Sequence, residues 1–184
     1  CVLDADARLY SNDYRAPEAL FAQLIQVAGR AGRSGGEHTK MLIETRYPND
    51  PIYQYLRNYD VAGYMKHLLK GRQESSLPPY VCHALVHAES RYMSDSLEFL
   101  AEAKTLIQKN SDANNRLICF DPVPKVLARV GGKERAQLLI EADSRAQLQV
   151  QLNCLDDFLR KQSNGRISKK GKVRWSIERD PLLI

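Results

Sequence analysis

A β-strand is predicted where the 184-residue chain reads Tyr80-Val81-Cys82-His83-Ala84-Leu85-Val86-His87-Ala88-Glu89, because its side chains alternate with the two-residue period of a strand. A helix is predicted directly after it, over 94–109, with Asp95 and Glu98 in capping-box spacing. The change of period indicates a domain that mixes strands and helices.

The elements that follow complete this domain. A short strand is predicted over 117–120, and Gly131-Gly132 indicates a turn before a further strand over 135–142. A last strand is predicted over 173–177. Four leucines at helical spacing predict a second helix before it: Leu148, Leu152, Leu155 and Leu159. The order of strand, helix, strand, strand, helix, strand predicts an α+β ferredoxin-like (βαββαβ) domain over 77–184, whose sheet leaves one face for a partner.

The first part of the chain is predicted to be the end of an α/β unit over 1–48. The apolar run that starts at Cys1 and enters acidic residues by 6 is typical of a buried parallel strand. Pro17-Glu18 suits the first turn of a helix. A second strand is expected over 38–44.

Residues 49–76 are predicted to form a helical connector. Asp50-Pro51 and Asp60 suit the starts of two helices, the second of which is expected to end near Gly71. The connector is rich in tyrosines interleaved with basic residues, which suits base stacking or packing between lobes: Tyr53, Tyr55, Tyr59 and Tyr64.

A basic motif precedes this connector, where the chain reads Gln26-Val27-Ala28-Gly29-Arg30-Ala31-Gly32-Arg33. Planar guanidinium groups bind phosphate oxygens in bidentate forks, and phosphoryl transfer depends on such charge stabilisation. The glycines are expected to let the backbone bend, so that the arginines point across a cleft. The alternative is a helix that ends in a solvated Gly-Arg turn. The motif resembles the last conserved motif of superfamily 2 helicases, which implies catalytic and nucleotide-binding roles: Gln26, Arg30 and Arg33, with Gly29 and Gly32.

Further elements point to one helicase family: Leu3-Asp4-Ala5-Asp6, Asp13-Tyr14-Arg15-Ala16, Leu77-Pro78-Pro79-Tyr80, Asp121-Pro122-Val123-Pro124 and Trp175-Ser176-Ile177-Glu178-Arg179-Asp180-Pro181. Together they resemble the C-terminal portion of the primosomal protein N′ (PriA) family of replication-restart helicases, over the whole chain. The resemblance implies that 1–48 ends a second RecA-like lobe. Glu178 replaces an aspartate that the family tends to have, a change that keeps the charge.

The resemblance implies ATP and Mg²⁺ as cofactors of the intact enzyme and none in this piece. The chain has no glycine-rich phosphate loop with a lysine, so it is not expected to hydrolyse ATP alone. The family's zinc-binding cysteines lie upstream. The four cysteines here form no Cys-x-x-Cys pair and are expected to be buried free thiols, while His83 and His87 are expected to lie far apart on one strand face. No metal site is predicted.

Basic residues before and within the last strand predict a DNA contact. With an adjacent aromatic ring, they suit a phosphate backbone and a stacked base: Arg166, Lys169, Lys170, Lys172, Arg174 and Trp175. A second group flanks the glycine turn: Lys125, Arg129, Lys133 and Arg135. The net charge of +5 agrees with binding to DNA. The alternative is a solvated hairpin loop.

The start of the last helix is a further candidate site. Ser144 is placed to cap this helix, and Arg145 and Gln149 match the positions with which the resembling family receives the acidic, apolar tail of single-stranded-DNA-binding protein. An arginine beside an apolar pocket suits a terminal carboxylate. The alternative is that both side chains are merely exposed on an amphipathic helix.

The predicted function is that of a fragment of an ATP-dependent 3′-to-5′ DNA helicase that recognises stalled or branched forks and restarts replication by primosome assembly. The expected partners are single-stranded and forked DNA, the single-stranded-DNA-binding protein and other primosome proteins. Without a signal peptide or a bilayer-spanning stretch, a cytoplasmic, nucleoid-associated bacterial protein with no membrane partner is expected. The alternative is a non-catalytic basic module that binds DNA and proteins.

Overall fold

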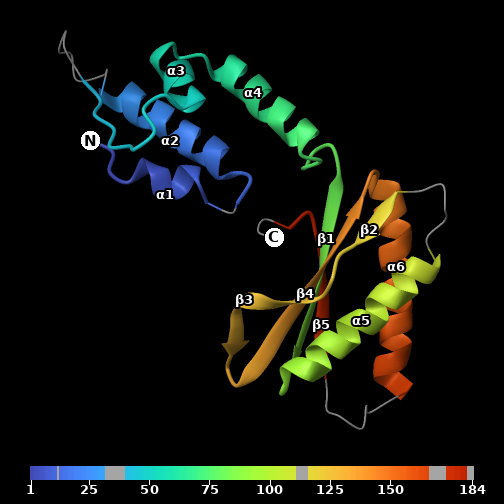
Figure 1. Cartoon of the computed structure of the whole chain (residues 1–184). Helices are drawn as coiled ribbons and strands as arrows, with labels where there is room; N and C mark the ends of the chain where they lie inside the picture. Colours follow the sequence, from blue (N-terminus) through green and yellow to red (C-terminus); the bar gives the residue numbers. More distant parts are fainter. Residues whose placement is uncertain (12, 32–39, 111–115, 166–172, 182–184) are drawn as a thin grey trace. The chain divides into compact units, whose positions relative to one another are not determined.

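The structure is a computed structural model that describes residues 1–11, 13–31, 40–110, 116–165 and 173–181. The chain divides into two compact units, Cys1–Leu77 and Pro78–Ile184, and each has a hydrophobic core of its own (Figure 1). Across the described ranges no helix combines the length and the apolar character that a bilayer crossing requires.

The first unit is built from helices: α1 (Ala5–Leu9), α2 (Ala16–Ala31), α3 (Pro51–Arg57) and α4 (Val61–Glu74). Its core joins residues of all four: Ala5, Leu9, Leu20, Phe21, Leu24, Ile52, Tyr53, Leu56 and Tyr64. The rings of Phe21 and Tyr64 lie 4.2 Å apart between centroids, so α2 and α4 meet through an aromatic pair. Residues 49–76 therefore share one core with α1 and α2.

Sheet structure in the described part of this unit is limited to one β-bridge. Val2 pairs in parallel with Ile43, through backbone bonds from Val2 N to Leu42 O (2.8 Å) and from Glu44 N to Val2 O (2.9 Å). The parallel direction was predicted, but a strand over 1–6 is wrong, because Asp4 adopts a left-handed φ of 54° and the chain turns into α1. The strand predicted over 38–44 is also wrong for its described residues, 40–44, where Ile43 forms the isolated bridge and no strand is present.

The two helix starts predicted by aspartates are confirmed. The Asp50 carboxylate accepts a hydrogen bond from Ile52 N at 3.0 Å, and that of Asp60 accepts one from Gly63 N at 2.8 Å. α4 continues to Glu74 rather than ending near Gly71. Tyr53 and Tyr64 are buried, which leaves them no face for a nucleic-acid base.

The second unit contains β1 (Cys82–Ser90), α5 (Met93–Asn110), β2 (Leu117–Cys119), β3 (Val123–Val130), β4 (Lys133–Ala142), α6 (Arg145–Gly165) and β5 (Arg174–Arg179). The strands form an antiparallel sheet in the order β2-β4-β1-β5, and β3 also pairs with β4. The predicted order of elements is confirmed except for β3, which the sequence did not predict. The predicted turn at Gly131-Gly132 is confirmed, with φ of 58° and 74°.

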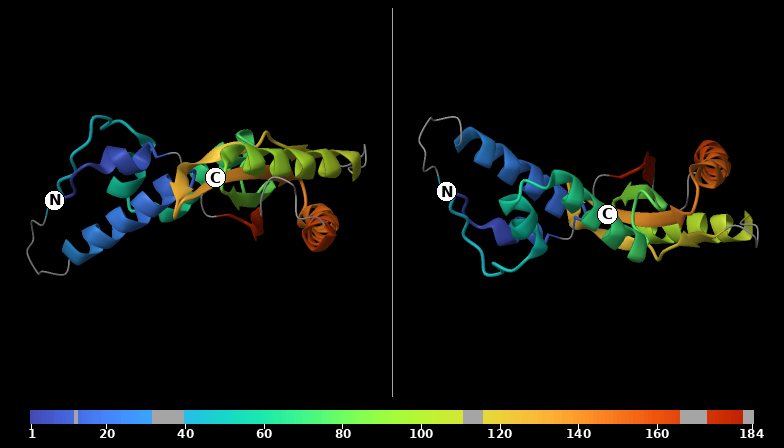
Figure 2. Two further views of the ribbon diagram at one scale, coloured as in Figure 1. Left: turned by 90° about the horizontal axis from the view of Figure 1, so that it is seen from below. Right: turned by 90° about the horizontal axis from the view of Figure 1, so that it is seen from above.

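Helices α5 and α6 cover the same face of this sheet (Figure 2). The buried side chains of β1 and β4 that face them alternate along each strand: Ala84, Val86 and Ala88, and Ala136, Leu138 and Ile140. The leucine face predicted for the last helix is buried against them, as Leu148, Leu152, Leu155 and Leu159. Alternation on two neighbouring strands therefore fixes which face of the sheet is the core.

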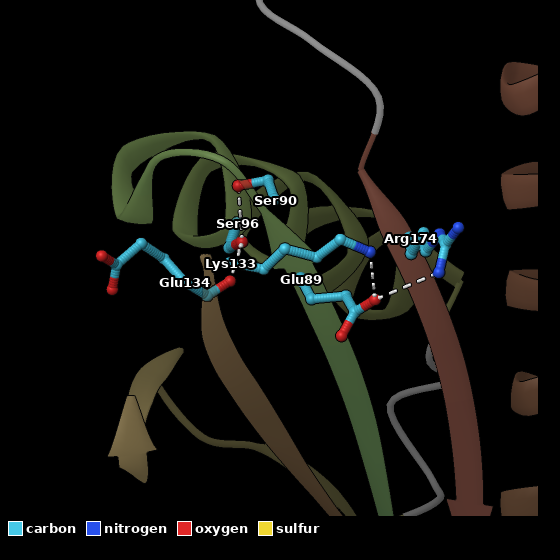
Figure 3. Close-up of polar contacts among 6 residues, drawn as sticks. All are labelled: Glu89, Ser90, Ser96, Lys133, Glu134 and Arg174. Atoms are coloured by element: carbon cyan, nitrogen blue, oxygen red, sulfur yellow. Dashed lines mark hydrogen bonds and ion pairs between the residues drawn. The ribbon is translucent and has the colours of Figure 1, made fainter. Parts of the chain in front are cut away.

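The turn from β1 into α5 is held by a buried pair of serines (Figure 3). The hydroxyl groups of Ser90 and Ser96 lie 2.9 Å apart, and Ser90 Oγ also donates to Tyr92 O at 2.6 Å. Ser96 Oγ donates to the backbone oxygen of Glu134 on β4 at 3.3 Å. These bonds tie the start of α5 to the ends of two strands.

Candidate functional site

The arginine motif lies at the end of α2. Gln26 and Arg30 are both exposed and stand four residues apart, so they share one side of the helix. A guanidinium there can reach an anion presented by another segment. The bend predicted at Gly29 is wrong, because α2 continues through this residue to Ala31. Gly32 and Arg33 lie outside the described residues.

Two predicted DNA-binding residues lie on β5, on opposite faces of the sheet. Trp175 pairs with Ala88 and packs partly against the core, so only part of its ring is available to stack on a base. Arg174 pairs with Glu89 and points to the other face, where its Nη1 lies 3.8 Å from the Glu89 carboxylate. The remaining residues of this prediction lie outside the described part of the chain: Arg166, Lys169, Lys170 and Lys172.

Glu89 joins the ends of three strands (Figure 3). The same carboxylate oxygen that faces Arg174 accepts a hydrogen bond from Lys133 Nζ at 3.0 Å. This hydrogen bond, with the positive charges of Lys133, Arg174 and Arg135, lowers the pKa of Glu89 below its usual value. Glu89 thus offsets part of the positive charge of Lys133 and Arg174 and holds both side chains near the same ends of the strands.

The candidate partner site at the start of α6 is a small polar cluster. Ser144 Oγ accepts a hydrogen bond from Gln147 N at 3.3 Å, which confirms the predicted cap. Arg145 Nη2 lies 3.4 Å from a carboxylate oxygen of Asp180, and Arg179 Nη1 donates to Gln149 Oε1 at 2.5 Å.

The structure therefore brings Arg145 and Gln149 together with Arg179, the last residue of β5, and with Asp180, which follows it. The sequence did not predict Arg179 or Asp180 as members of this cluster, because only the pairing of β5 with β1 places them there. The cluster presents two guanidinium groups, an amide and a carboxylate. Its exposed arginines suit a carboxylate ligand, and Asp180 already occupies one of them.

The histidines of β1 are engaged with carboxylates of two different strands. His83 Nε2 lies 3.1 Å from Glu141 of β4, and His87 Nε2 lies 2.9 Å from Glu178 of β5. They are therefore separated on one strand face, as predicted. Within the described ranges, no three His, Cys, Asp or Glu side chains are grouped to hold a metal ion.

The cysteines differ in exposure. Cys119 is buried, and burial raises the pKa of its thiol to about 11. The prediction of buried thiols is wrong for Cys1 and Cys154, which are exposed. The latter lies on the face of α6 away from its buried leucines.

Comparison with known proteins identifies relatives over almost all of the chain. The family described as primosomal protein N C-terminal domain matches residues 73–182. The replication restart protein PriA of Haemophilus influenzae is 29% identical over 98% of this chain, and that of Bacillus subtilis is 27% identical over 100%. The PriA of Treponema pallidum is 31% identical over 84% of this chain. The matches cover 23%, 22% and 23% of these relatives, so the chain spans under a quarter of their length.

Proposed function

The chain belongs to the family of PriA replication restart proteins, and on that basis we propose that it is the C-terminal part of an ATP-dependent 3′-to-5′ DNA helicase. The intact enzyme recognises stalled or branched replication forks and restarts replication by primosome assembly. One observation carries the proposal: a chain whose second unit matches this family also holds the helicase sequence Gln-x-x-Gly-Arg-x-Gly-Arg, whose described residues lie at the C-terminal end of α2.

The nucleotide role rests on where the motif lies. Gln26 and Arg30 face away from the core of the first unit, so they are free to approach a nucleotide bound to an upstream lobe. ATP with Mg²⁺ supplies the transferred phosphoryl group. Arg33 and Arg30 stabilise the charge that develops on the phosphate oxygens, and Gln26 positions the site. The parallel bridge between Val2 and Ile43 supports the assignment of 1–48 to the end of a RecA-like lobe.

The second unit is assigned to DNA and partner binding. Its strand order β2-β4-β1-β5 supports a ferredoxin-like domain with β3 added at one edge. The basic residues from Arg166 to Arg174 bind the phosphates of single-stranded or forked DNA. Arg145 and Gln149 receive the tail of single-stranded-DNA-binding protein, whose carboxylate takes the place of Asp180 on Arg145.

Substitution of the arginine motif tests the helicase proposal. In the full-length protein, Arg33→Ala is expected to lower DNA-stimulated ATP hydrolysis by about a hundredfold or more, because an arginine finger contributes factors of that order. Lys66→Ala, an exposed cation on α4 of the same unit, serves as the control and is expected to leave turnover unchanged. Normal turnover in the Arg33→Ala enzyme would refute the role.

A non-catalytic binding module is the second candidate, and the separate core of the second unit favours it. Such a unit needs no motor to fold or to bind. The two candidates differ in the parent gene, because only a helicase requires a phosphate loop with its lysine upstream.

A further inference from the structure

The edge strand β3 carries an exposed apolar pair that the fold does not use. Val126 is 104% exposed and Leu127 is 70% exposed. They lie where β3 leaves its register with β4: Pro124 pairs with Ala136, but the next paired residue is Arg129, opposite Glu134. Residues 125–128 thus bulge from the ladder, and β3 bends along its length (Figure 1). We refer to Val123–Val130 as the β3 arm.

The β3 arm is basic, and further basic residues follow it at the start of β4. Residues 123–130 hold two basic side chains, Lys125 and Arg129, and no acidic one, and Lys133 and Arg135 follow on β4 beside the acidic Glu134. Arg129 lies 3.6 Å from Glu134 but keeps 72% of its side chain exposed. Burial, together with the neighbouring charge of Arg135, lowers the pKa of Lys125, and the carboxylate of Glu178 partly offsets this effect. The exposed apolar residues Val126 and Leu127 beside these cations are complementary to a nucleic acid, which has charged phosphates and apolar base faces.

A strand from another protein is a poor occupant of this edge. Pro124 has no N–H group to donate, and the bulge interrupts the row of backbone groups that an added strand would need. Charged side chains next to the bulge oppose edge pairing further. The β3 arm therefore offers side chains, rather than backbone, to a partner.

We propose that the β3 arm is a second DNA contact, separate from the basic residues before β5, and that Val126 and Leu127 wedge against bases where a fork opens. Apolar side chains that enter a base step unstack it, and flanking arginines hold the adjacent phosphates. Arg129 is the phosphate contact of the arm. The inference rests on the proposed DNA-binding function, since it adds a surface to it.

Fluorescence anisotropy of the 184-residue chain with a labelled DNA fork tests the proposal, across a salt series. The fork carries 2-aminopurine at the junction, so that unstacking is read from its emission. Val126→Ser with Leu127→Ser is expected to weaken binding about tenfold and to abolish the rise in emission, with no change in salt dependence. Arg129→Gln is expected to lower the slope of log K against log salt by about one. Val150→Ser, which replaces an exposed side chain of α6, is the matched control and is expected to bind normally.

Three outcomes would overturn the inference. Arm variants that bind and unstack the fork normally, while Lys169, Lys170 and Lys172 changed to Glu abolish binding, would leave the proposed function intact and remove the arm from it. Absence of binding by the unsubstituted chain at every salt concentration would refute both. An apolar variant that changes only self-association in sedimentation would show a second copy to be the occupant. Because the substituted side chains are exposed, each variant is expected to unfold at the same temperature as the unsubstituted chain.

Discussion

In the described residues, Cys1–Leu77 packs four helices on one another and has one β-bridge, whereas Pro78–Ile184 packs two helices on a five-stranded sheet. The first unit exposes apolar side chains beside its bridge, with Leu3 at 71% and Leu42 at 65%. The sheet of the second unit instead buries the core-facing residues of its two central strands almost completely. Helix caps and aromatic packing organise the first unit, and strand register organises the second.

The difference indicates where each unit is vulnerable. The bonds that define α3 and α4 in the first unit, such as those of Asp50 and Asp60, span two or three residues. In the second unit, the contacts that close the sheet join residues far apart, such as His87 and Glu178, separated by 91 positions. A hydrogen bond between near neighbours can persist when another part of the unit opens. A sheet contact between distant residues is lost when either of its strands detaches.

The largest expected effect comes from the separate cores. Leu155→Ala removes a fully buried side chain of the second unit, and Phe21→Ala removes one from the first. Each is expected to lower the free energy of unfolding of its own unit by about 3 kcal/mol or more, through lost burial and a cavity. Calorimetry should resolve two transitions, with one shifted in each variant. A single transition shifted by both variants would show that the two units unfold together and do not depend on separate cores.

A pair of glycines on α4 tests how tightly the first unit is packed. A Cβ at Gly63 would overlap the Asp60 carboxylate and lie 2.9 Å from Tyr55 Cε1, whereas one at Gly71 would meet nothing within 4 Å. Gly63→Ala is therefore expected to destabilise the unit by about 1–2 kcal/mol, as it displaces the cap. Gly71→Ala is expected to stabilise it by about 0.5–1 kcal/mol. Urea titrations giving the same sign for both would contradict this packing.

The smallest expected effect concerns ion pairs. The folded pKa of Glu89 is lowered, so its contribution to stability is present above its unfolded pKa and is lost as the pH falls through the folded value. Glu89→Gln is expected to cost ~0.5 kcal/mol at pH 7 and progressively less in acid. In the first unit, Glu74→Gln breaks a more exposed 3.9 Å pair with Lys70 and is expected to change little. Equal urea midpoints for the Glu89 variant and the unsubstituted chain at pH 7 would show that the ion pairs of Glu89 stabilise the protein no more than the exposed pair of Glu74 and Lys70 does.

Long, regular patterns were the predictable part of the fold. The alternation around β1 and the leucine face of α6 gave the core of the second unit correctly, because each repeats over several periods. Short segments failed for local reasons. β3 contains Pro124 and reads as a loop, and it is held as a strand only by its pairing with β4. Asp4 turns the chain into α1 where an apolar run predicted a strand.

The candidate sites were predicted unevenly. Arg145 and Gln149 follow from the family resemblance, but their neighbours Arg179 and Asp180 depend on a strand pairing that the local sequence does not encode. The helix through Gly29 shows that one glycine does not end a helix whose other side is held by Phe21 and Leu24. Tertiary packing, rather than propensity, decided both cases.

The position of β1 at the centre of the sheet has a consequence for synthesis. Its two neighbours, β4 and β5, are translated after it, and β5 is complete only at Arg179. At the ~5–20 residues per second of translation, β1 waits roughly 5–20 s for its last partner. During that interval the apolar residues of β1 lack one or both of their neighbouring strands, and early pairing with β4 shortens their exposure during synthesis.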